Sequence, residues 1–600
     1  MTLKPLRTLC KIGKNLNFCL IFWGVLFFSG LSAYEVRFQG LTDSTLLELV
    51  KSSSQLEKLK ANTPVTATGL KRRAQGDLPN IIQALHSRAY YNAKVDFTIE
   101  EQGELVIISI DIGSIYPLVD FRIVYMQQGV PFPEFCDRIS LQDLGIEIGA
   151  AALPETILNA EDTLLDILNT KGYAFAAIKK QEALANQKEQ HVIIFLEVET
   201  GPLSYFGPLK IAGTARVLNE FFYKKLRWQE GDLYNPVKIA QTQEALELSG
   251  LFRSITITHA EGPVEGNFLP ITIQVVEAKQ RSVGFGVNYT TEFNLGPGIT
   301  LEWEDRNVFG KGQKLSFRTD LWLHRQEGSI SYVVPDFRQA DQNLIWQMDY
   351  KHEKIEAFTD STLSLSATIE RKLSERLRIS YGAMYKLIRS KHSDDNRTFD
   401  LIQAPLQLRW SNTDSLLDPK KGATIHLKLI PSVQVLPPQF AYAIGTFTGS
   451  HYYPLTQDLR TVLATKLTLG SIIGASKHDI PPPERFYAGS ENTIRGYKYW
   501  TISPLNKHHK PIGGRSMLVY SLELRHKFSE SWGGVAFFDM GNVYSNPLPN
   551  FKEPLRQALG LGIRYYTPIG PLRVDLAIPL NKRRHIDKAY QIYFSIGQAF

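Results

Sequence analysis

The strongest constraint on the fold is a strict alternation of apolar and polar residues in the carboxyl-terminal half of the chain. After Lys279 the sequence consists of segments of roughly ten residues, separated by turns rich in Gly, Pro, Asn and Asp. Successive side chains of a strand point to opposite sides, so each segment has one apolar face and one polar, often charged, face. The apolar faces include Val283, Phe285, Val287 and Tyr289; Leu315, Phe317, Leu321 and Leu323; Ile425, Leu427 and Leu429; and Leu572, Val574, Leu576 and Ile578. The pattern predicts antiparallel strands.

Two architectures can contain strands of this kind. In a soluble sandwich the apolar faces would contact a second sheet, whereas in a membrane barrel they would contact lipid and the charged residues would line the lumen. The alternating segments number sixteen, and an even number suits a closed antiparallel barrel, which leaves no backbone group unpaired in lipid. The sequence therefore favours an all-β, 16-stranded antiparallel transmembrane barrel over residues 280–600, with a lumen wide enough to conduct or to need filling.

The segment before the barrel, residues 34–278, repeats one pattern at a spacing of about 80 residues. Each unit begins with a short strand, continues with two helical stretches and ends with two strands rich in β-branched residues. The second helical stretch ends in a similar sequence motif each time: Ser87-Arg88-Ala89-Tyr90, Thr170-Lys171-Gly172-Tyr173 and Ser249-Gly250-Leu251-Phe252. The repeats predict three α+β modules of the type β-α-α-β-β, at residues 34–114, 115–201 and 202–279. An open sheet edge in such a module can bind an extended chain by strand addition, whereas packed scaffolding modules would bind nothing.

The first 33 residues have the plan of a secretory signal peptide. A basic region from Lys4 to Lys14 precedes an apolar region from Leu16 to Phe28 and a cleavage region of small residues that ends at Ala33. We expect residues 1–33 to be removed on export, with a retained membrane anchor as the alternative. Cys136 would then be the single cysteine of the mature chain, which could form no internal disulfide.

The longest segment without alternation is residues 475–514, about forty residues between two predicted strands. Its proline-stiffened start and its aromatic residues favour an ordered loop that fills the lumen. Gly496 permits a tight turn that would present Arg495, and a guanidinium in a lumen needs a carboxylate partner. Among inward-facing acids on the next strands, Asp539 is the first candidate and Glu523 the second. Alternatively, Arg495 is a solvated loop charge.

Composition and motifs argue against several functional classes. The net charge is +7, and residues 1–33 contribute four basic residues and no acid, so the remainder carries +3. This charge is too small and too dispersed for a nucleic-acid surface. The sequence contains no Gly-x-Ser-x-Gly, His-Glu-x-x-His or phosphate-loop lysine motif, and His508-His509 reads as a solvated pair. We therefore expect a protein that is not an enzyme and uses no metal and no cofactor.

Several sequence motifs together make the chain resemble the BamA/TamA superfamily of outer-membrane assembly factors. They are Arg485-Phe486-Tyr487-Ala488-Gly489, Ile494-Arg495-Gly496-Tyr497, Asn307-Val308-Phe309-Gly310-Lys311-Gly312, Asp418-Pro419-Lys420-Lys421-Gly422, Phe538-Asp539-Met540-Gly541, Gly562-Ile563-Arg564-Tyr565, Pro568-Ile569-Gly570-Pro571 and Ile578-Pro579-Leu580. The resemblance implies that the three modules are POTRA domains and that Gly489, Arg495, Gly496 and Tyr497 form the lumen-loop motif. The family often has a Gly pair where this chain has Gly489-Ser490, and a positive φ at Ser490 would be strained.

Among members of this family, the three modules and the chain length are most similar to the TamA-like type. The resemblance implies a translocation and assembly module subunit of the bacterial outer membrane, with its POTRA domains in the periplasm. It would insert or assemble β-barrel and autotransporter proteins through a lateral gate between Arg281–Thr290 and Tyr590–Phe600. The implied partners are a TamB-like inner-membrane-anchored protein, unfolded client proteins and the lipid bilayer, with no nucleic acid.

The last strand resembles the terminal signal by which outer-membrane barrels are themselves recognised. It carries Ile592, Phe594, Ile596 and Phe600 on one face, and Gly597 on the other face could let the strand bend inward. The alternative functions within this resemblance are a BamA-like insertase and a two-partner-type secretion pore that acts as a gated passive channel.

Overall fold

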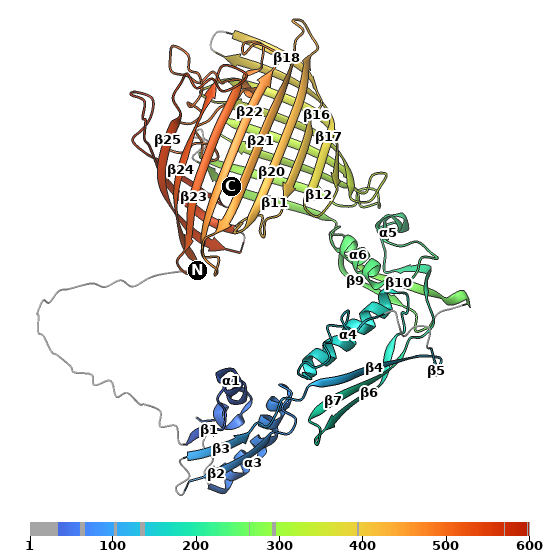
Figure 1. Cartoon of the computed structure of the whole chain (residues 1–600). Coiled ribbons are helices and arrows are strands. Elements are labelled where there is room, and N and C mark those ends of the chain that lie inside the picture. Colours follow the sequence, from blue (N-terminus) through green and yellow to red (C-terminus); the bar gives the residue numbers. More distant parts are fainter. Residues whose placement is uncertain are drawn as a thin grey trace, which may run out of the picture. The chain divides into compact units, whose positions relative to one another are not determined.

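Three small α+β modules precede a large antiparallel sheet in the computed structural model, as Figure 1 shows. The structure describes residues 34–60, 67–100, 105–132, 139–262, 265–290, 296–392, 395–568, 570–596, 598 and 600. The predicted signal peptide and Cys136 lie outside these residues. Among the described residues, no helix has the length and apolar character needed to cross a membrane.

The first module is a three-stranded sheet with helices packed on it. Its elements are β1 (Glu35–Gln39), α1 (Ser44–Ser53), α2 (Gln55–Lys58), α3 (Ala67–His86), β2 (Lys94–Ile99) and β3 (Leu105–Asp111). The strand order is β1-β3-β2, with β1 parallel and β2 antiparallel to the central strand. Val50, Ile81 and Ile108 are among the fully buried side chains of its core. β1 and β2 are therefore the two edges of this sheet.

The second module has four strands and differs from the predicted pattern in its helices. It contains β4 (Leu118–Gln127), β5 (Val130–Pro131), α4 (Pro154–Thr170), β6 (Ala177–Asn186) and β7 (His191–Glu199), in the sheet order β5-β4-β7-β6. The sequence predicts two helical stretches, but α4 is the one helix among the described residues of this module. Residues 141–145 form turns, and residues 133–138 lie outside the described part.

The third module returns to the three-stranded arrangement. It contains β8 (Tyr205–Ala212), α5 (Asn219–Lys225), α6 (Pro236–Glu247), β9 (Phe252–His259), a 3-10 turn η2 (Glu265–Asn267) and β10 (Phe268–Glu277), in the order β8-β10-β9. Phe221, Phe222, Leu246 and Ile273 lie in its core. The aromatic pair of α5 therefore faces the sheet.

The repeated motif ends a helical stretch with a residue of positive φ in all three modules. Ala89, Gly172 and Gly250 have φ angles of 67°, 97° and 66°, in the left-handed region that closes a helix. In the second module the N–H of Tyr173 then donates to the carbonyl of Leu168 at 3.1 Å, so the aromatic residue folds back on the helix. The equivalent geometry supports the interpretation of these modules as repeats.

Glu277, the last residue of β10, holds the start of the segment before α5. Its Oε1 accepts hydrogen bonds from the backbone N–H groups of Ala215, Arg216 and Val217 at 2.8, 2.8 and 2.9 Å. Burial raises the pKa of Glu277, but these three donors outweigh it and hold the pKa below its ordinary value. The ionised carboxylate therefore stabilises the third module.

We expect Glu277→Ala to destabilise the third module by about 1–3 kcal/mol, because three backbone donors lose their acceptor. Because the folded pKa is depressed, the contribution of Glu277 is present above the unfolded pKa of about 4.3 and is lost as the pH falls through the folded value. Urea-dependent limited proteolysis of the full chain at several pH values measures both effects. The exposed Glu230→Ala is the matched control, and equal protection of the two variants at neutral pH would contradict the expectation.

The remaining strands form one continuous antiparallel sheet in sequence order (Figure 1). They are β11 (Arg281–Thr290), β12 (Gly296–Asp305), β13 (Lys314–Trp322), β14 (Arg325–Val334), β15 (Gln342–Lys354), β16 (Thr359–Lys372), β17 (Leu377–His392), β18 (Asp395–Gln403), β19 (Leu406–Ser411), β20 (Gly422–Gln434), β21 (Ala441–Pro454), β22 (Thr461–Ile473), β23 (Ser516–Lys527), β24 (Trp532–Tyr544), β25 (Arg556–Thr567), β26 (Gly570–Pro579) and β27 (Gln591–Ile596).

The described sheet has seventeen strand segments, where the sequence predicts sixteen strands. The difference arises at one position, because β18 and β19 both lie between β17 and β20. Pro405 separates the two segments, and a proline has no N–H with which to continue a ladder. The seventeen segments therefore occupy sixteen positions around the sheet.

The two faces of the barrel strands differ as the alternation predicts. Val283 and Phe285 of β11 are 81% and 69% exposed, and Val574 of β26 is 41% exposed. The charged neighbours on β26, Arg573 and Asp575, are 2% and 0% exposed, so they point into the barrel. An apolar exterior with charges inside suits a barrel surrounded by lipid and not a sandwich in water.

Candidate functional site in the barrel lumen

The segment between β22 and β23 folds into the barrel and has a fixed internal structure. Short bridges pair Phe486 with Gly514 and Ala488 with Ile502. The guanidinium of Arg485 donates to the carbonyl of Ile480 at 2.7 and 2.9 Å. The buried apolar side chains of the loop, Ile480, Phe486, Ala488, Ile494, Tyr497 and Ile502, pack in one cluster with the inward-facing strand residues Ile444, Ile472, Val519 and Val543.

A tight turn precedes the Arg-Gly-Tyr motif. Gly489 has a φ of +100°, and the backbone N–H groups of Gly489 and Ser490 donate to Oγ1 of Thr493 at 3.1 and 3.0 Å. Ser490 is not among the residues with positive φ, so it causes no strain in place of a second glycine. Gly496 has a φ of +90°, and a Cβ there would lie 3.2 Å from the backbone nitrogen of Pro579. The motif therefore requires glycine at positions 489 and 496.

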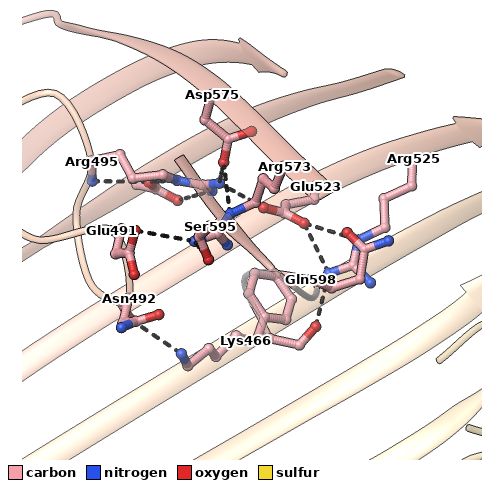
Figure 2. Close-up of polar contacts among 12 residues, drawn as sticks. Lys466, Glu491, Asn492, Arg495, Glu523, Arg525, Arg573, Asp575, Ser595 and Gln598 are labelled. Atoms are coloured by element: carbon pink, nitrogen blue, oxygen red, sulfur yellow. Dashed lines mark hydrogen bonds and ion pairs between the residues drawn. The ribbon is translucent and has the colours of Figure 1, made fainter. Parts of the chain in front are cut away.

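Arg495 is the centre of the site and is 1% exposed. Its Nε–H and Nη2 donate to the two carboxylate oxygens of Asp539 at 2.7 and 2.9 Å, a bidentate pair. Its Nη1 donates to Glu523 at 2.7 Å and to Asp575 at 3.2 Å. The guanidinium carbon lies 3.4 Å from the ring centroid of Phe537. Arg495 thus joins the loop to β23, β24 and β26 at once. Figure 2 shows it beside Glu523 and Asp575.

Further arginines neutralise the remaining charge of these carboxylates. Arg525 donates from Nε to Glu523 at 2.9 Å, and Arg564 forms an ion pair with Asp575. Arg573 lies 3.6 Å from the same Asp575 carboxylate. All three arginines are at most 4% exposed. The lumen therefore contains a buried network of alternating charges, in which each carboxylate contacts more than one arginine or several donors of one arginine.

The last strand, β27, is attached to this network on its lumen side. The backbone N–H of Gly496 donates to the hydroxyl of Tyr593 at 2.9 Å. Arg573 donates to Oγ of Ser595 at 3.2 Å and forms an ion pair with Glu491 of the loop at 3.4 Å, as Figure 2 shows. The loop motif is therefore held by the strand at the end of the sheet as well as by the strands before it.

Gln598 and Phe600, which follow β27, also lie in the lumen. Arg525 donates to the backbone oxygen of Phe600 at 2.9 Å, and its guanidinium carbon lies 5.1 Å from the Phe600 ring centroid. Gln598 accepts a hydrogen bond from Nε of Arg564 at 3.2 Å and donates to Asp418 at 2.8 Å. Gln598 and Phe600 therefore contact two of the arginines that surround the loop motif, Arg564 and Arg525.

This placement corrects one expectation about the terminal strand. Ile592 and Phe594 are 43% and 52% exposed and face outward together, but Phe600 packs inside the barrel. Phe600 lies beyond β27, which ends at Ile596, and the alternation of side chains applies only within a strand. The Ile596 side chain and Gly597 lie outside the described part of the structure.

The structure brings both predicted carboxylates, Asp539 and Glu523, to Arg495. Sequence reasoning missed the third, Asp575, together with the pairing of Arg564 and Arg573 to it. A signal was present, because Arg573 and Asp575 are the charged residues of the inner face of β26. The alternation assigns these side chains to the lumen, but it does not say which of the lumen charges meet.

Chemically, the site is suited to holding segments together. A buried carboxylate or guanidinium is stable only while its partners remain, so removal of one member of such a cluster costs about 3–5 kcal/mol. Within the described residues, no group of three or more His, Cys, Asp and Glu side chains is arranged to hold a metal ion. The arrangement therefore fixes the loop against the final strands of the barrel.

Comparisons with known proteins identify the domains of the chain. Residues 307–600 match the Omp85 superfamily domain, and residues 204–278 match POTRA, described as a surface antigen variable number repeat. The "Outer membrane protein assembly factor BamA" of Nitratidesulfovibrio vulgaris is 25% identical over 466 residues, which are 74% of this chain and 57% of that protein. The protein of the same name from Neisseria meningitidis serogroup B is 21% identical over 496 residues, 72% of this chain and 61% of that protein. The matched region thus spans about three fifths of the length of these two curated relatives.

A solved structure shares the fold. The crystal structure of BamA from Haemophilus ducreyi lacking POTRA domains 1-3 has a TM-score of 0.68 at 19% identity, and the match covers 80% of this chain and 99% of that chain. The predicted combination of POTRA domains with a large antiparallel barrel is confirmed. The barrel lies in the bacterial outer membrane and the POTRA domains lie in the periplasm. Residues 307–600 are therefore a domain of the Omp85 superfamily, and a POTRA domain at residues 204–278 precedes it in the chain.

Proposed function

We propose that this chain is a TamA-like assembly factor, which inserts or assembles β-barrel and autotransporter proteins through a lateral gate between β11 and β27. The two relatives are named outer membrane protein assembly factor, which supports insertion of outer-membrane proteins as the general activity. The observation that carries the proposal is the attachment of β27 to the lumen loop. It couples the position of the loop to the sheet edge where a client strand would pair.

The pairing of the last strand supports a gate at this position. β27 pairs with β26 over six residues, from Ala577 opposite Gln591 to Leu572 opposite Ile596, whereas β25 and β26 pair over ten. β11 and β27 end the sheet order, and no pairing between them is recorded among the described residues. An opened strand edge leaves N–H and C=O groups unpaired in lipid, which costs several kcal/mol per group. An incoming client strand that pairs with these groups would therefore fold against the open edge.

The three modules support the TamA-like assignment and a periplasmic partner. The edges of the first module, β1 and β2, could each receive a strand of a TamB-like, inner-membrane-anchored protein. Affinity capture from the cell envelope tests this partner, with a chain that lacks residues 34–114 as the control. Recovery of no large inner-membrane-anchored protein, or recovery by both chains alike, would count against it.

Reconstitution in liposomes tests the insertion activity. The full chain is expected to accelerate folding of a denatured client barrel by about tenfold over protein-free liposomes, because a templated strand avoids the cost of unpaired backbone groups in lipid. Heat-modifiable migration of the client in gels measures the folded fraction. The control is a liposome with an unrelated closed barrel.

The same liposomes separate an insertase from a passive pore. The lumen contains the ordered loop, so we expect small and unsteady conductance in planar bilayers. Large, steady ohmic conductance together with no acceleration of client folding would instead favour a gated secretion channel.

A further inference from the structure

A cavity of about 550 Å³ lies at the cell-exterior end of the barrel, beside the last strand. Arg281 begins β11 directly after the periplasmic modules, so this end of β11 faces the periplasm. Strands alternate in direction, so the turns after β13 and β15 lie at the opposite, exterior end. His324 and Lys354, which line the cavity, belong to these exterior positions.

Three parts of the barrel form the walls of the cavity and are tied to one another. The first wall is the pair of turns with Lys354 and Glu356, and the second is the loop segment with Lys498 and Trp500. The Lys498 ammonium lies 2.8 Å from the Glu356 carboxylate and connects these two walls. The third wall is β27 and the segment before it, including Lys588.

A second tie connects the third wall to the loop. Arg583, in the segment between β26 and β27, donates to the carbonyl oxygen of Thr501 at 2.6 Å and to its hydroxyl at 2.7 Å. Arg583 is itself held by Asp587, whose carboxylate lies 2.8 Å from Nε. The cavity is therefore formed before any ligand arrives.

The cavity has an excess of positive charge. Lys354, Lys498 and Lys588 line it, and Glu356 is the single acidic residue among the lining residues. Lys498 is paired with Glu356, whereas the structure records no ion pair or hydrogen bond for the side chains of Lys354 and Lys588 within its described residues. Both of these side chains are exposed. Two ammonium groups that face one cavity favour an anion with more than one negative charge.

The lining of the cavity includes neighbouring residues from both faces of the last strand. Tyr593 points inward and is 7% exposed, whereas its neighbour Ile592 points outward and is 43% exposed, and both line the cavity. The ring of Trp500 stacks on that of Tyr487, with 4.6 Å between the ring centroids, and supplies an aromatic face in the second wall. A ligand that carries a charged head group and an apolar or sugar portion fits this combination.

We propose that this cavity binds a phosphate-bearing anion, either the phosphorylated head group of an outer-leaflet lipid or a soluble phosphate compound. The phosphate oxygens accept hydrogen bonds from Lys354 and Lys588. Because Lys354 is the last residue of β15 and Lys588 precedes β27, the bound anion connects the turn after β15 with the segment before the last strand. This site does not depend on the proposed insertion activity.

Equilibrium binding of radiolabelled inorganic phosphate to the full, detergent-solubilised chain tests the site. We expect saturable binding that weakens as NaCl is raised, and about tenfold weaker binding in the double variant Lys354→Gln/Lys588→Gln, because two ammonium groups are removed. The matched control is Lys507→Gln/Lys510→Gln, an equal charge change in the exposed part of the same loop, outside the cavity lining. Heat-modifiable migration verifies that both variants are folded.

Two results would overturn the proposal. One is the absence of saturable phosphate binding by the native chain, and the other is an equal loss of binding in the cavity variant and in the control. To separate the two sources, the native chain is reconstituted in phosphatidylcholine vesicles with or without lipid A. An about tenfold higher phosphate midpoint with lipid A supports the head group as ligand, and an unchanged midpoint supports a soluble phosphate compound.

Discussion

Replacing Arg495 with alanine is expected to release the lumen loop while the barrel stays folded. The change removes the hydrogen bonds to Asp539, Glu523 and Asp575 and leaves these carboxylates buried with fewer partners. The loss of one member of such a cluster costs about 3–5 kcal/mol, so the loop should leave its place in the lumen much more often. The strand ladders do not involve Arg495, so they should persist. We expect rapid proteolysis of the loop, unchanged heat-modifiability and an about tenfold slower client insertion.

Three variants separate the role of Arg495 from a general loss of charge. Arg495→Lys keeps the charge but not the bidentate geometry, so it should be intermediate in loop protection. Arg584→Ala removes an exposed arginine of the segment between β26 and β27 and should behave as the native chain. The double variant Arg495→Ala/Asp539→Asn should regain part of the protection, because one unpaired carboxylate is removed. Full insertion activity and loop protection in Arg495→Ala would show that the ion pairs have no functional role.

Much of the fold could be predicted from the sequence because two periodic signals are strong. Inward and outward residues alternate on each barrel strand, and the motif that ends a helix recurs at Ala89, Gly172 and Gly250 with the same left-handed geometry. Both signals depend on local backbone chemistry, which a single sequence records directly. The break at Pro405 is also local, but the alternation continues on both sides of it, so the pattern alone does not separate β18 from β19.

The site could be predicted only in part, because its partners are distant in the sequence. The loop motif and the inward direction of Asp539 follow from local patterns, but Asp575 is 80 residues from Arg495 in the chain. Which lumen charges meet depends on the tilt and stagger of the whole barrel, which no local pattern specifies. Phe600 shows the same limit, since its ring turns inward to Arg525 only after the strand has ended.

Joining the two ends of the sheet should abolish client insertion. Cysteines at Val287 of β11 and Ile592 of β27, both on the lipid-facing side, would be joined by a short bismaleimide in a Cys136→Ser background. Neighbouring strands lie about 4.8 Å apart, so a short reagent can span the two positions when the strands are adjacent. If clients enter between β11 and β27, the joined chain cannot offer its edges, and insertion should fall to about the protein-free rate. Client folding in liposomes before and after cross-linking measures the effect.

The matched control uses the same reagent on a pair of strands that need not separate. Leu576 and Ile592 are direct neighbours across β26 and β27, so a cross-link between cysteines at these positions leaves the β11 side of the last strand free. This chain should retain insertion activity, although the reagent modifies the same position of β27. If both cross-linked chains insert clients at the native rate, the client path does not pass between β11 and β27. If both lose activity, modification of β27 itself is the cause. Cross-links between other strands would then be needed to locate the gate.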